Sequence, residues 1–338
     1  MHVLMIGLNH QSAPVEIREK LSFHPDELAD AMVSLSNERS ILEAIIVSTC
    51  NRMEVYAVVD RLNTGRFYVK NFLAKWFHMT LDVFTPYLTI MEMEEAVRHL
   101  FRTTCGLNSM VIGETQILGQ IRTSFLIAQK YKTSGTVFNE LFKQVVTFAK
   151  KVHSDTKIGE NAVSVSYAAV ELAKQVYGSL SQCHLAIFGA GKMGELALQN
   201  LSGKGIGSIT VINRTFQKAQ EMAERFHGRA QPIEALESVM EKIDILISST
   251  GATHFVITPE MVENAQKKRG NTDLFMIDIA VPRDIDPQVG DILGVHLYDI
   301  DDLKEVVDSN LNERKREAEK IEDMIDVEIE KFFTWIGM

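Results

Sequence analysis

A cysteine stands directly after a run of apolar and β-branched residues near the start of the chain. Residues 41–49 predict a strand that faces a core, and they lead straight into Cys50, Asn51 and Arg52. Active-site groups are commonly held where a buried strand meets a loop, and a neighbouring arginine favours the thiolate form of a cysteine. Residues 41–49 and 53–59 are therefore predicted to form two strands, with Cys50 at the turn between them as a candidate nucleophile.

A glycine-rich turn is the second motif with a chemical meaning. It consists of Gly189, Ala190, Gly191, Lys192, Met193 and Gly194. The turn follows a predicted strand at 184–188 and opens a predicted helix at 192–202, which is the context of a dinucleotide-binding site. In such a turn the first glycine permits the bend, the second lets the backbone approach the pyrophosphate, and the third allows close helix–strand packing. The helix N-terminus then faces the phosphates.

The next predicted strand, 208–212, ends at Asn213, Arg214 and Thr215. A site for NAD usually carries an acidic residue at this point to bond the ribose 2′-hydroxyl, and this sequence has none there. The guanidinium of Arg214 instead suits a 2′-phosphate, so the sequence favours NADPH over NADH. The alternative is an exposed arginine that merely ends the strand. The loop at 248–252 follows a later strand and is expected near the nicotinamide.

Cysteine usage and hydropathy exclude several classes of protein. The three cysteines, Cys50, Cys105 and Cys183, lie far apart and form no CxxC pair, so neither a disulfide framework nor a metal site is indicated. A reducing cytoplasm fits best, and Cys105 and Cys183 are expected to be inert and buried. No apolar stretch reaches the length of a membrane span, and the first residues lack the basic leader of a signal peptide.

The net charge of −10 argues against indiscriminate binding of nucleic acid, but the charge is unevenly distributed. Residues 1–160 are balanced, so the whole acidic excess lies in the second half. Within residues 118–157 basic residues outnumber acidic ones. This local excess either attracts phosphates or forms an ordinary solvated helix face, and the sequence leaves both open.

Hydrophobic periodicity divides the chain into three parts and predicts an α/β fold. Residues 1–155 mix strands and helices and form the expected catalytic domain, with helices predicted at 65–78, 92–104, 115–131 and 137–153. The polar stretch 154–162 marks the junction to residues 156–300, where alternating strands and helices predict a doubly wound parallel sheet that binds NADP. Residues 301–338 predict one long amphipathic helix of about 35 residues, with apolar positions recurring from Leu303 to Phe332.

Several long segments, in the same order along the chain, resemble the glutamyl-tRNA reductase family. These segments are 7–10, 13–19, 48–54, 99–101, 106–122, 189–194, 213–215 and 278–283. The resemblance covers essentially the whole chain. It implies that glutamyl-tRNA is reduced by NADPH to glutamate-1-semialdehyde through a thioester on Cys50, with release of the tRNA. This reaction is the first step of tetrapyrrole synthesis by the five-carbon route.

The resemblance also assigns site residues and partners. It implies that Cys50 is the nucleophile, that the position of His99 matters for activity, and that eight residues line the glutamate site. These eight are Thr49, Asn51, Arg52, Ser109, Glu114, Thr115, Gln116 and Gln120. It further suggests the next enzyme of the pathway, glutamate-1-semialdehyde aminomutase, as a candidate partner. Family members usually continue past the long helix as a helical dimerisation domain, so the homodimer of the family is left open for this chain.

Other interpretations remain on the residues alone. Segment 106–122 is equally a glycine-containing connection between helices, and a lone His99 is more often structural than catalytic. An ordinary NADP-dependent aldehyde or acyl reductase that uses the same cysteine on a free small molecule would show the same motifs. A protein that binds NADP as a sensor, or tRNA as a scaffold, would share some of them without consuming cofactor.

Overall fold

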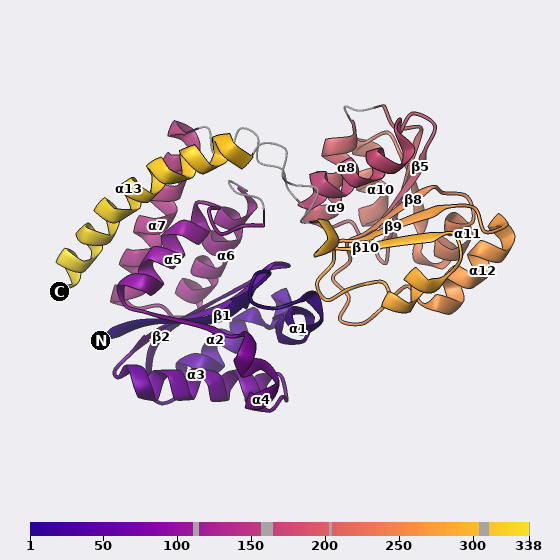
Figure 1. The fold of residues 1–338 in the computed structure, drawn as a ribbon. Helices are drawn as coiled ribbons and strands as arrows, with labels where there is room; N and C mark the ends of the chain where they lie inside the picture. Colours follow the sequence, from indigo (N-terminus) through magenta and orange to yellow (C-terminus); the bar gives the residue numbers. More distant parts are fainter. Residues whose placement is uncertain (111–114, 157–164, 203–204, 304–310, 338) are drawn as a thin grey trace. The chain divides into compact units, whose positions relative to one another are not determined.

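The computed structural model describes residues 1–110, 115–156, 165–202, 205–303 and 311–337 (Figure 1). Contacts within the chain divide it into two units. The first unit joins Met1–Ala162 to Asn310–Met338, and the second comprises Val163–Ser309. The predicted junction at 154–162 lies mostly outside the described residues, so the expected domain limits at 155 and 300 stay predictions.

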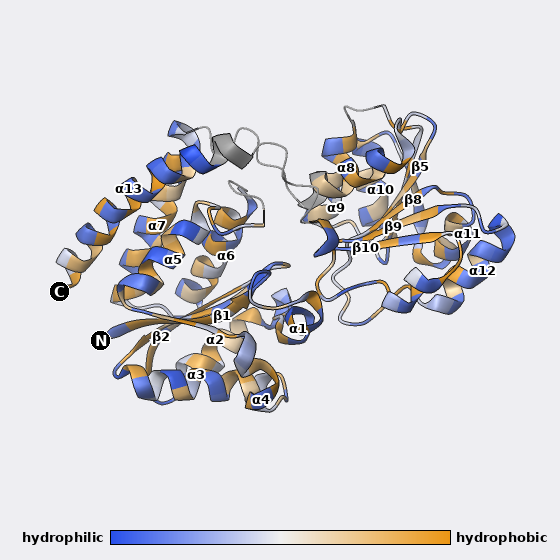
Figure 2. Ribbon diagram, in the orientation of Figure 1, coloured by the Kyte–Doolittle hydropathy of each residue, from blue (hydrophilic) through white to orange (hydrophobic). Residues whose placement is uncertain are grey.

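An antiparallel sheet of four strands forms the centre of the first unit. Its strands are β1 (His2–Asn9), β2 (Ile41–Ser48), β3 (Arg52–Val59) and β4 (Thr89–Glu92), in the order β2-β3-β1-β4. Every residue of β3 is buried, because helices cover both faces of the sheet. The strands appear as apolar bands in Figure 2. The two strands predicted on either side of Cys50 are confirmed.

Helices cover the two faces of this sheet (Figure 1). One face carries α2 (Leu28–Ser36) and α3 (Leu62–Trp76), and the other carries α5 (Glu94–Thr104), α6 (Gln116–Lys130) and α7 (Thr136–Asp155). The short helices α1 (Val15–Arg18) and α4 (Leu81–Phe84) lie in the connections between larger elements. The four helices predicted from periodicity in this part of the chain therefore exist, with ends shifted by a few residues.

A buried acid fixes the start of α7. Glu43 lies in the middle of β2 and is 6% exposed. Its carboxylate accepts hydrogen bonds from the backbone N–H groups of Val137 (3.0 Å) and Phe138 (2.8 Å), which no carbonyl within the helix can satisfy. The positive end of the helix dipole also favours a negative charge at this point. The single acid within the apolar run 41–48 is thus a helix cap supplied by a strand.

Helix α13 (Leu311–Ile336) spans 26 residues and packs on α5 and α7 (Figure 1). Its apolar side chains enter the core of the first unit, and the deepest are Ile321, Ile325, Ile329 and Phe332. Residue 301 lies in a turn in which its N–H donates to Oδ1 of Asp299, and residues 302–303 have 3₁₀-helical conformation, so the expected start at 301 stays a prediction. Residues 304–310 lie outside the described residues.

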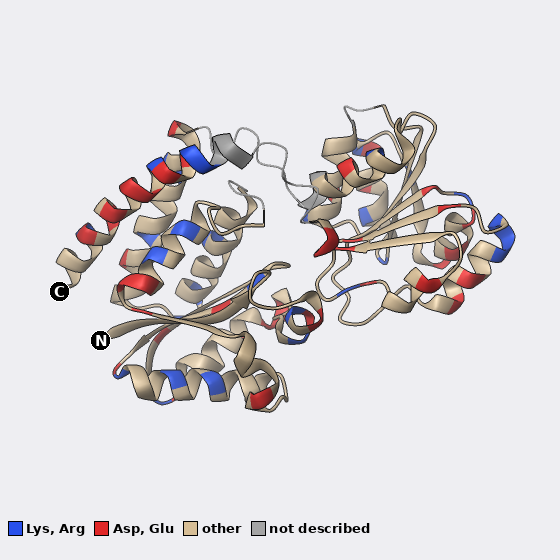
Figure 3. Cartoon of the chain, viewed as in Figure 1, with Lys and Arg blue, Asp and Glu red and all other residues tan. Residues whose placement is uncertain are grey.

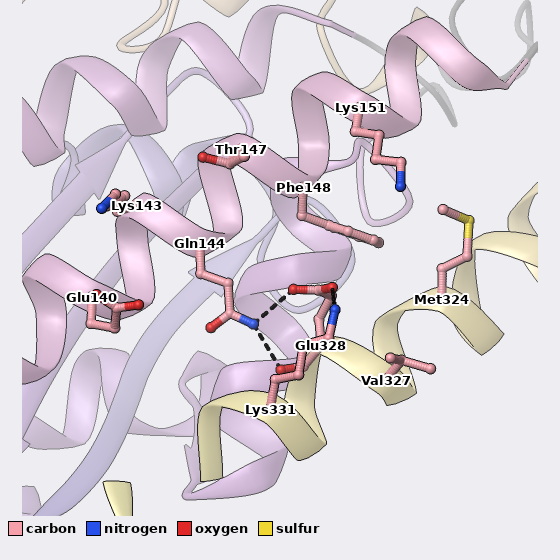
Figure 4. Close-up of a pocket in the computed structure, with 10 residues that line it drawn as sticks. All are labelled: Glu140, Lys143, Gln144, Thr147, Phe148, Lys151, Met324, Val327, Glu328 and Lys331. Atoms are coloured by element: carbon pink, nitrogen blue, oxygen red, sulfur yellow. Dashed lines mark hydrogen bonds and ion pairs between the residues drawn. The ribbon is translucent and has the colours of Figure 1, made fainter. Parts of the chain in front are cut away.

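Polar contacts also anchor α13 to α7. Nε2 of Gln144 donates to the backbone carbonyl (2.9 Å) and to Oε2 (2.8 Å) of Glu328, and Lys331 donates to Oε1 of the same carboxylate (2.7 Å) (Figure 4). These groups border a hollow of about 490 Å³ between the two helices, where Phe148 and Met324 also face the opening. The contacts hold α13 against α7 through residues that are distant in sequence from Cys50.

A parallel sheet of six strands forms the centre of the second unit. Its strands are β5 (His184–Phe188), β6 (Ser208–Asn213), β7 (Arg229–Pro232), β8 (Ile245–Ser248), β9 (Leu274–Asp278) and β10 (Val295–Asp299). In the order β10-β9-β8-β5-β6-β7, the chain adds β6 and β7 on one side of β5 and then β8, β9 and β10 on the other side. The strand order therefore reverses between β5 and β8, as in doubly wound dinucleotide-binding sheets. The predicted fold class is confirmed.

Helices connect successive strands of this sheet (Figure 1). They are α9 (Lys192–Ser202), α10 (Phe216–Arg225), α11 (Leu236–Met240) and α12 (Pro259–Arg269), while α8 (Val165–Tyr177) precedes the first strand, β5. The helices that follow β5, β6 and β8 leave those strands at their carboxyl ends, where ligands bind in open α/β sheets. Among the helices of the described residues, none is both long and apolar enough to cross a membrane.

Candidate active site

Cys50 lies in the tight connection between β2 and β3 and is half-buried. The turn is fixed by its neighbours, because Oγ1 of Thr49 accepts the backbone N–H groups of Asn51 and Arg52, each at 3.2 Å. The backbone N–H of His10, just beyond β1, donates to the carbonyl of Asn51 at 2.9 Å. The hydroxyl of Thr49 is thus engaged in shaping the turn. The thiol therefore lies in a short, hydrogen-bonded turn between two strands and not in a long loop.

A charged cluster is buried directly behind this turn. Arg52, Glu54 and Tyr56 alternate along β3 and therefore share one face of the sheet. Nη1 of Arg52 donates to Oε1 of Glu54 at 2.8 Å, and the Tyr56 hydroxyl donates to Oε2 at 2.6 Å. Nε2 of His99, on α5, lies 2.7 Å from Oε1. One carboxylate therefore gathers an arginine, a tyrosine and a histidine.

The cluster controls the ionisation of its own members. Burial alone would raise the pKa of Glu54, but the His99 ring and the Arg52 guanidinium, with hydrogen bonds from His99 and Tyr56, outweigh it. The pKa of Glu54 consequently lies well below its usual range. Burial and the neighbouring Glu54 raise the pKa of Tyr56 well above its usual value, so its hydroxyl stays a donor.

Asn108 closes the other side of His99. Nε of Arg102 can only donate, and it lies 3.1 Å from Oδ1 of Asn108, which turns the amide nitrogen of Asn108 toward Nδ1 of His99 at 3.4 Å. The ring therefore accepts at Nδ1 and donates from Nε2 to Glu54. The carbonyl of Asn108 also accepts from Nη2 of Arg52 at 2.5 Å. His99 is 7% exposed and is held from both ring nitrogens.

A hollow of about 370 Å³ opens beside His99 in the first unit. Most of the residues that line it have polar side chains, and they are Asn9, Gln11, Ser12, Thr89, Met91, Glu95, Arg98, His99, Arg102 and Asn108. Asn9 pairs with Arg52 across β1 and β3, so the hollow lies close to the turn that carries Cys50. Glu54, Asn108 and the two α5 arginines were not assigned roles from the sequence. They all lie within or next to segments that carry the resemblance, which was the available signal.

The predicted glutamate-site residues fall into two groups. Hydrogen bonds join Thr49, Asn51 and Arg52 to one another, and Glu54 joins Arg52 to His99. The others lie further along the chain, with Ser109 half-buried after α5, Thr115 and Gln120 exposed, and Gln116 half-buried at the start of α6. Within the described residues no side-chain hydrogen bond joins this second group to the first. Glu114 lies outside the described residues.

Arg52 makes more hydrogen bonds inside the protein than the sequence suggested. Its guanidinium is 2% exposed and bonds Glu54, the Asn108 carbonyl and Oγ1 of Thr103 (3.4 Å). The negative charge of Glu54, 2.8 Å away, offsets its positive charge. Cys105 is buried, and burial raises the pKa of its thiol to about 12. Burial and then Asp244 raise the pKa of Cys183.

The glycine turn in the second unit has the geometry that the motif predicts. Gly189 has φ of 108°, and a Cβ there would lie 2.2 Å from the carbonyl oxygen of Ser249. A Cβ at Gly194 would lie 2.8 Å from the carbonyl oxygen of Gly189 and 3.1 Å from Ile187, so only glycine permits this close helix–strand packing. A Cβ built on Gly191 would meet no atom within 4 Å beyond its chain neighbours and its own helix, so this side of the backbone is open to a ligand.

Residues after β6 complete the turn. Oδ1 of Asn213 accepts the backbone N–H of Ala190 at 3.2 Å, and its amide nitrogen donates to the Thr215 carbonyl at 3.1 Å. Asn213 therefore braces the turn. Arg214 is exposed and has no ion pair with a described residue. Lys192 is exposed and Met193 is half-buried at the start of α9.

Two buried acids hold the loops at the carboxyl ends of β8 and β9. Asp284 accepts Ser248 Oγ (2.6 Å) and the N–H of Thr250 (2.8 Å), while Asp278 accepts backbone N–H groups including that of Asp284 (2.8 Å). Burial is the main cause that raises the pKa of both carboxyls. The backbone N–H of Ser249 donates to the Phe188 carbonyl at 2.8 Å, which fixes this loop beside the glycine turn.

A doubly wound parallel sheet, with a glycine turn and an open backbone at the point where strand order reverses, defines a nicotinamide-dinucleotide-dependent oxidoreductase. Residues 6–156 match the family described as glutamyl-tRNAGlu reductase, N-terminal domain, and residues 171–306 match the family described as shikimate / quinate 5-dehydrogenase.

Similar proteins agree on the family. The chain is 60% identical over 337 residues to a glutamyl-tRNA reductase from Bacillus subtilis and to one from Priestia megaterium, and covers 74% and 76% of them. The solved glutamyl-tRNA reductase from Methanopyrus kandleri matches 99% of this chain and 80% of its own, at 32% identity and a TM-score of 0.52. The chain belongs to the glutamyl-tRNA reductase family.

Proposed function

We propose that the chain reduces the glutamyl group of glutamyl-tRNA to glutamate-1-semialdehyde, with NADPH as reductant and Cys50 as nucleophile. The observation that carries this function is the position of Cys50. The thiol is partly exposed on a braced turn, next to a polar hollow, in a chain that also carries a dinucleotide turn. Family membership supports the substrate and the first step of tetrapyrrole synthesis.

Acyl transfer to Cys50 is the first chemical step. The sulfur adds to the ester carbonyl, the bond to the ribose oxygen of the tRNA breaks, and that oxygen leaves with a proton as the tRNA 3′ end. A covalent thioester splits one difficult reduction into two easier steps. His99 lines the hollow with both ring nitrogens bonded inside the protein, so it is best placed to shape the acyl site.

NADPH fits the second unit, because the open backbone at Gly191 leaves room for a pyrophosphate and the exposed Arg214 is available for a 2′-phosphate. When bound, NADPH supplies the hydride that converts the thioester carbonyl to an aldehyde and returns Cys50 as thiolate. Asn213 and the loop after β8 keep the turn in shape. The homodimer and the pairing with glutamate-1-semialdehyde aminomutase stay predictions.

A single-turnover reaction tests the proposal. The chain is mixed with glutamyl-tRNA without NADPH, and the glutamyl adduct is located by mass spectrometry. Cys50→Ser should abolish the adduct, whereas Cys105→Ser and Cys183→Ser should keep it, because both those thiols are buried. Adding NADPH should then consume the cofactor and release the aldehyde. Turnover of free glutamate derivatives without tRNA would instead favour a small-molecule reductase.

A further inference from the structure

Two arginines that line the 370 Å³ hollow beside His99 form ion pairs with carboxylates of α13. Nη1 of Arg98 lies 2.5 Å from Oδ1 of Asp326, and Arg102 pairs with Glu322. The two pairs stand one helical turn apart on both helices. Figure 3 shows acidic residues along α13 and basic residues on α5. Helix α13 therefore reaches the border of the hollow through charged side chains.

The Arg102 pair continues inward to His99. Nε of Arg102 donates to Asn108, the Asn108 amide nitrogen faces Nδ1 of His99, and Nε2 of His99 faces Glu54. An unbroken series of polar contacts thus runs from Glu322 to the buried carboxylate. Among the described residues, the polar partners of Arg98 are Glu94 and Asp326, so that pair does not extend to Asn108.

We propose that Glu322 is a positioning residue for the acyl-transfer site, acting through Arg102 and Asn108 on the ring of His99. The physical reason lies in the Asn108 amide, whose oxygen and nitrogen are nearly equal in size and distinguished only by their partners. If Arg102 is released, only Thr103, 3.3 Å from the amide nitrogen, still orients the Asn108 side chain, and the contact of that nitrogen with Nδ1 of His99 is weakened. The ring is then held firmly only at Nε2, by the ionised carboxylate of Glu54 at 2.7 Å.

Three variants on α13 test this inference, which rests on the proposed function for the reaction that it tunes. Glu322→Ala removes the carboxylate, Glu322→Asp keeps it, and Glu328→Ala is the matched control. Glu328 is also a partly buried carboxylate that anchors α13, but its partners are Gln144 and Lys331, and none of these three residues lines the hollow beside His99. Urea unfolding of each variant controls for loss of helix docking.

Two readouts are measured, namely single-turnover acylation of Cys50 by glutamyl-tRNA and the ¹⁵N shifts of His99, assigned with His99→Gln. Glu322→Ala should slow acylation by about two- to fivefold, the range for an ion pair that solvent still reaches. KM for glutamyl-tRNA should stay about the same, because the carboxylate of Glu322 pairs with Arg102 and touches no substrate. The ¹⁵N shift of Nδ1 of His99 should change more than that of Nε2, and Glu322→Asp should restore both the rate and the shifts.

Equal slowing by Glu322→Ala and Glu328→Ala would overturn the inference, because the effect would then follow helix docking. Unchanged His99 shifts in Glu322→Ala would also overturn it. If the parent chain forms no adduct at all, the proposed function fails. The ¹⁵N shifts would still decide whether Glu322 acts on the ring of His99.

Discussion

Replacing Glu54 by glutamine should destabilise the first unit strongly. The carboxylate accepts Nη1 of Arg52 at 2.8 Å, Nε2 of His99 at 2.7 Å and the Tyr56 hydroxyl at 2.6 Å, and is 2% exposed. A glutamine amide keeps the shape but leaves the Arg52 charge without a counter-ion and brings N–H donors against donors. Breaking a buried pair in this way costs about 3 kcal/mol or more at pH 7.

The pH dependence of this loss has a definite sign. Because the pKa of Glu54 in the folded chain is held below its unfolded value of about 4.3, the carboxylate stabilises the fold fully above that pH. The contribution is lost as the pH falls through the folded pKa. The difference in unfolding free energy between parent and Glu54→Gln should therefore narrow as the pH falls below about 4.

Urea unfolding followed by tryptophan fluorescence measures this difference. The only two tryptophans of the chain, Trp76 and Trp335, both belong to the first unit, so the signal reports on that unit. Glu330→Gln, at an exposed position on α13, is the control and should change stability by less than about 0.5 kcal/mol. If Glu54→Gln resembled this control, or if its penalty grew as the pH fell below about 4, the account of the buried cluster would be refuted.

Three further predictions concern other parts of the chain. Glu43→Ala should lower the unfolding free energy of the first unit by about 2 kcal/mol, measured by the same urea assay, because α7 loses a charged cap. Gly189→Ala should weaken NADPH binding by more than about tenfold in calorimetry, since its Cβ would meet the Ser249 carbonyl at 2.2 Å. Arg214→Asp should shift the ratio of kcat/KM for NADPH over NADH by about tenfold or more toward NADH, and an unchanged ratio would exclude a 2′-phosphate contact.

Local sequence patterns predicted the elements that position both candidate sites. The β-branched run at 41–49 predicted β2 and placed Cys50 in the turn before β3, because a strand buried on both faces has a continuous apolar signature. The glycines at 189–194 predicted a turn whose demands are local, since tight bending and close packing exclude any Cβ. The edge strands β4 and β7 were missed because each has only four residues, with polar side chains among them.

Long-range pairings explain what the sequence could not reveal. Glu54 received no role from the sequence, although its carboxylate contacts Arg52, Tyr56 and His99. The reason is that His99, on α5, is distant in sequence from Glu54. Asn108 shows the same difficulty, since its amide is oriented by Arg102 and its carbonyl by Arg52.

Arg52 shows how the fold limits the function that its residue type suggests. An arginine beside a candidate nucleophile is a natural partner for a substrate carboxylate, yet its donors already serve Glu54, Thr103 and the Asn108 carbonyl. These contacts fix the guanidinium plane, and with 2% of the residue exposed its donors serve the protein interior. The same contacts make the residue structural. The buried charge of Glu54 is then best understood as the group that keeps Arg52 in place.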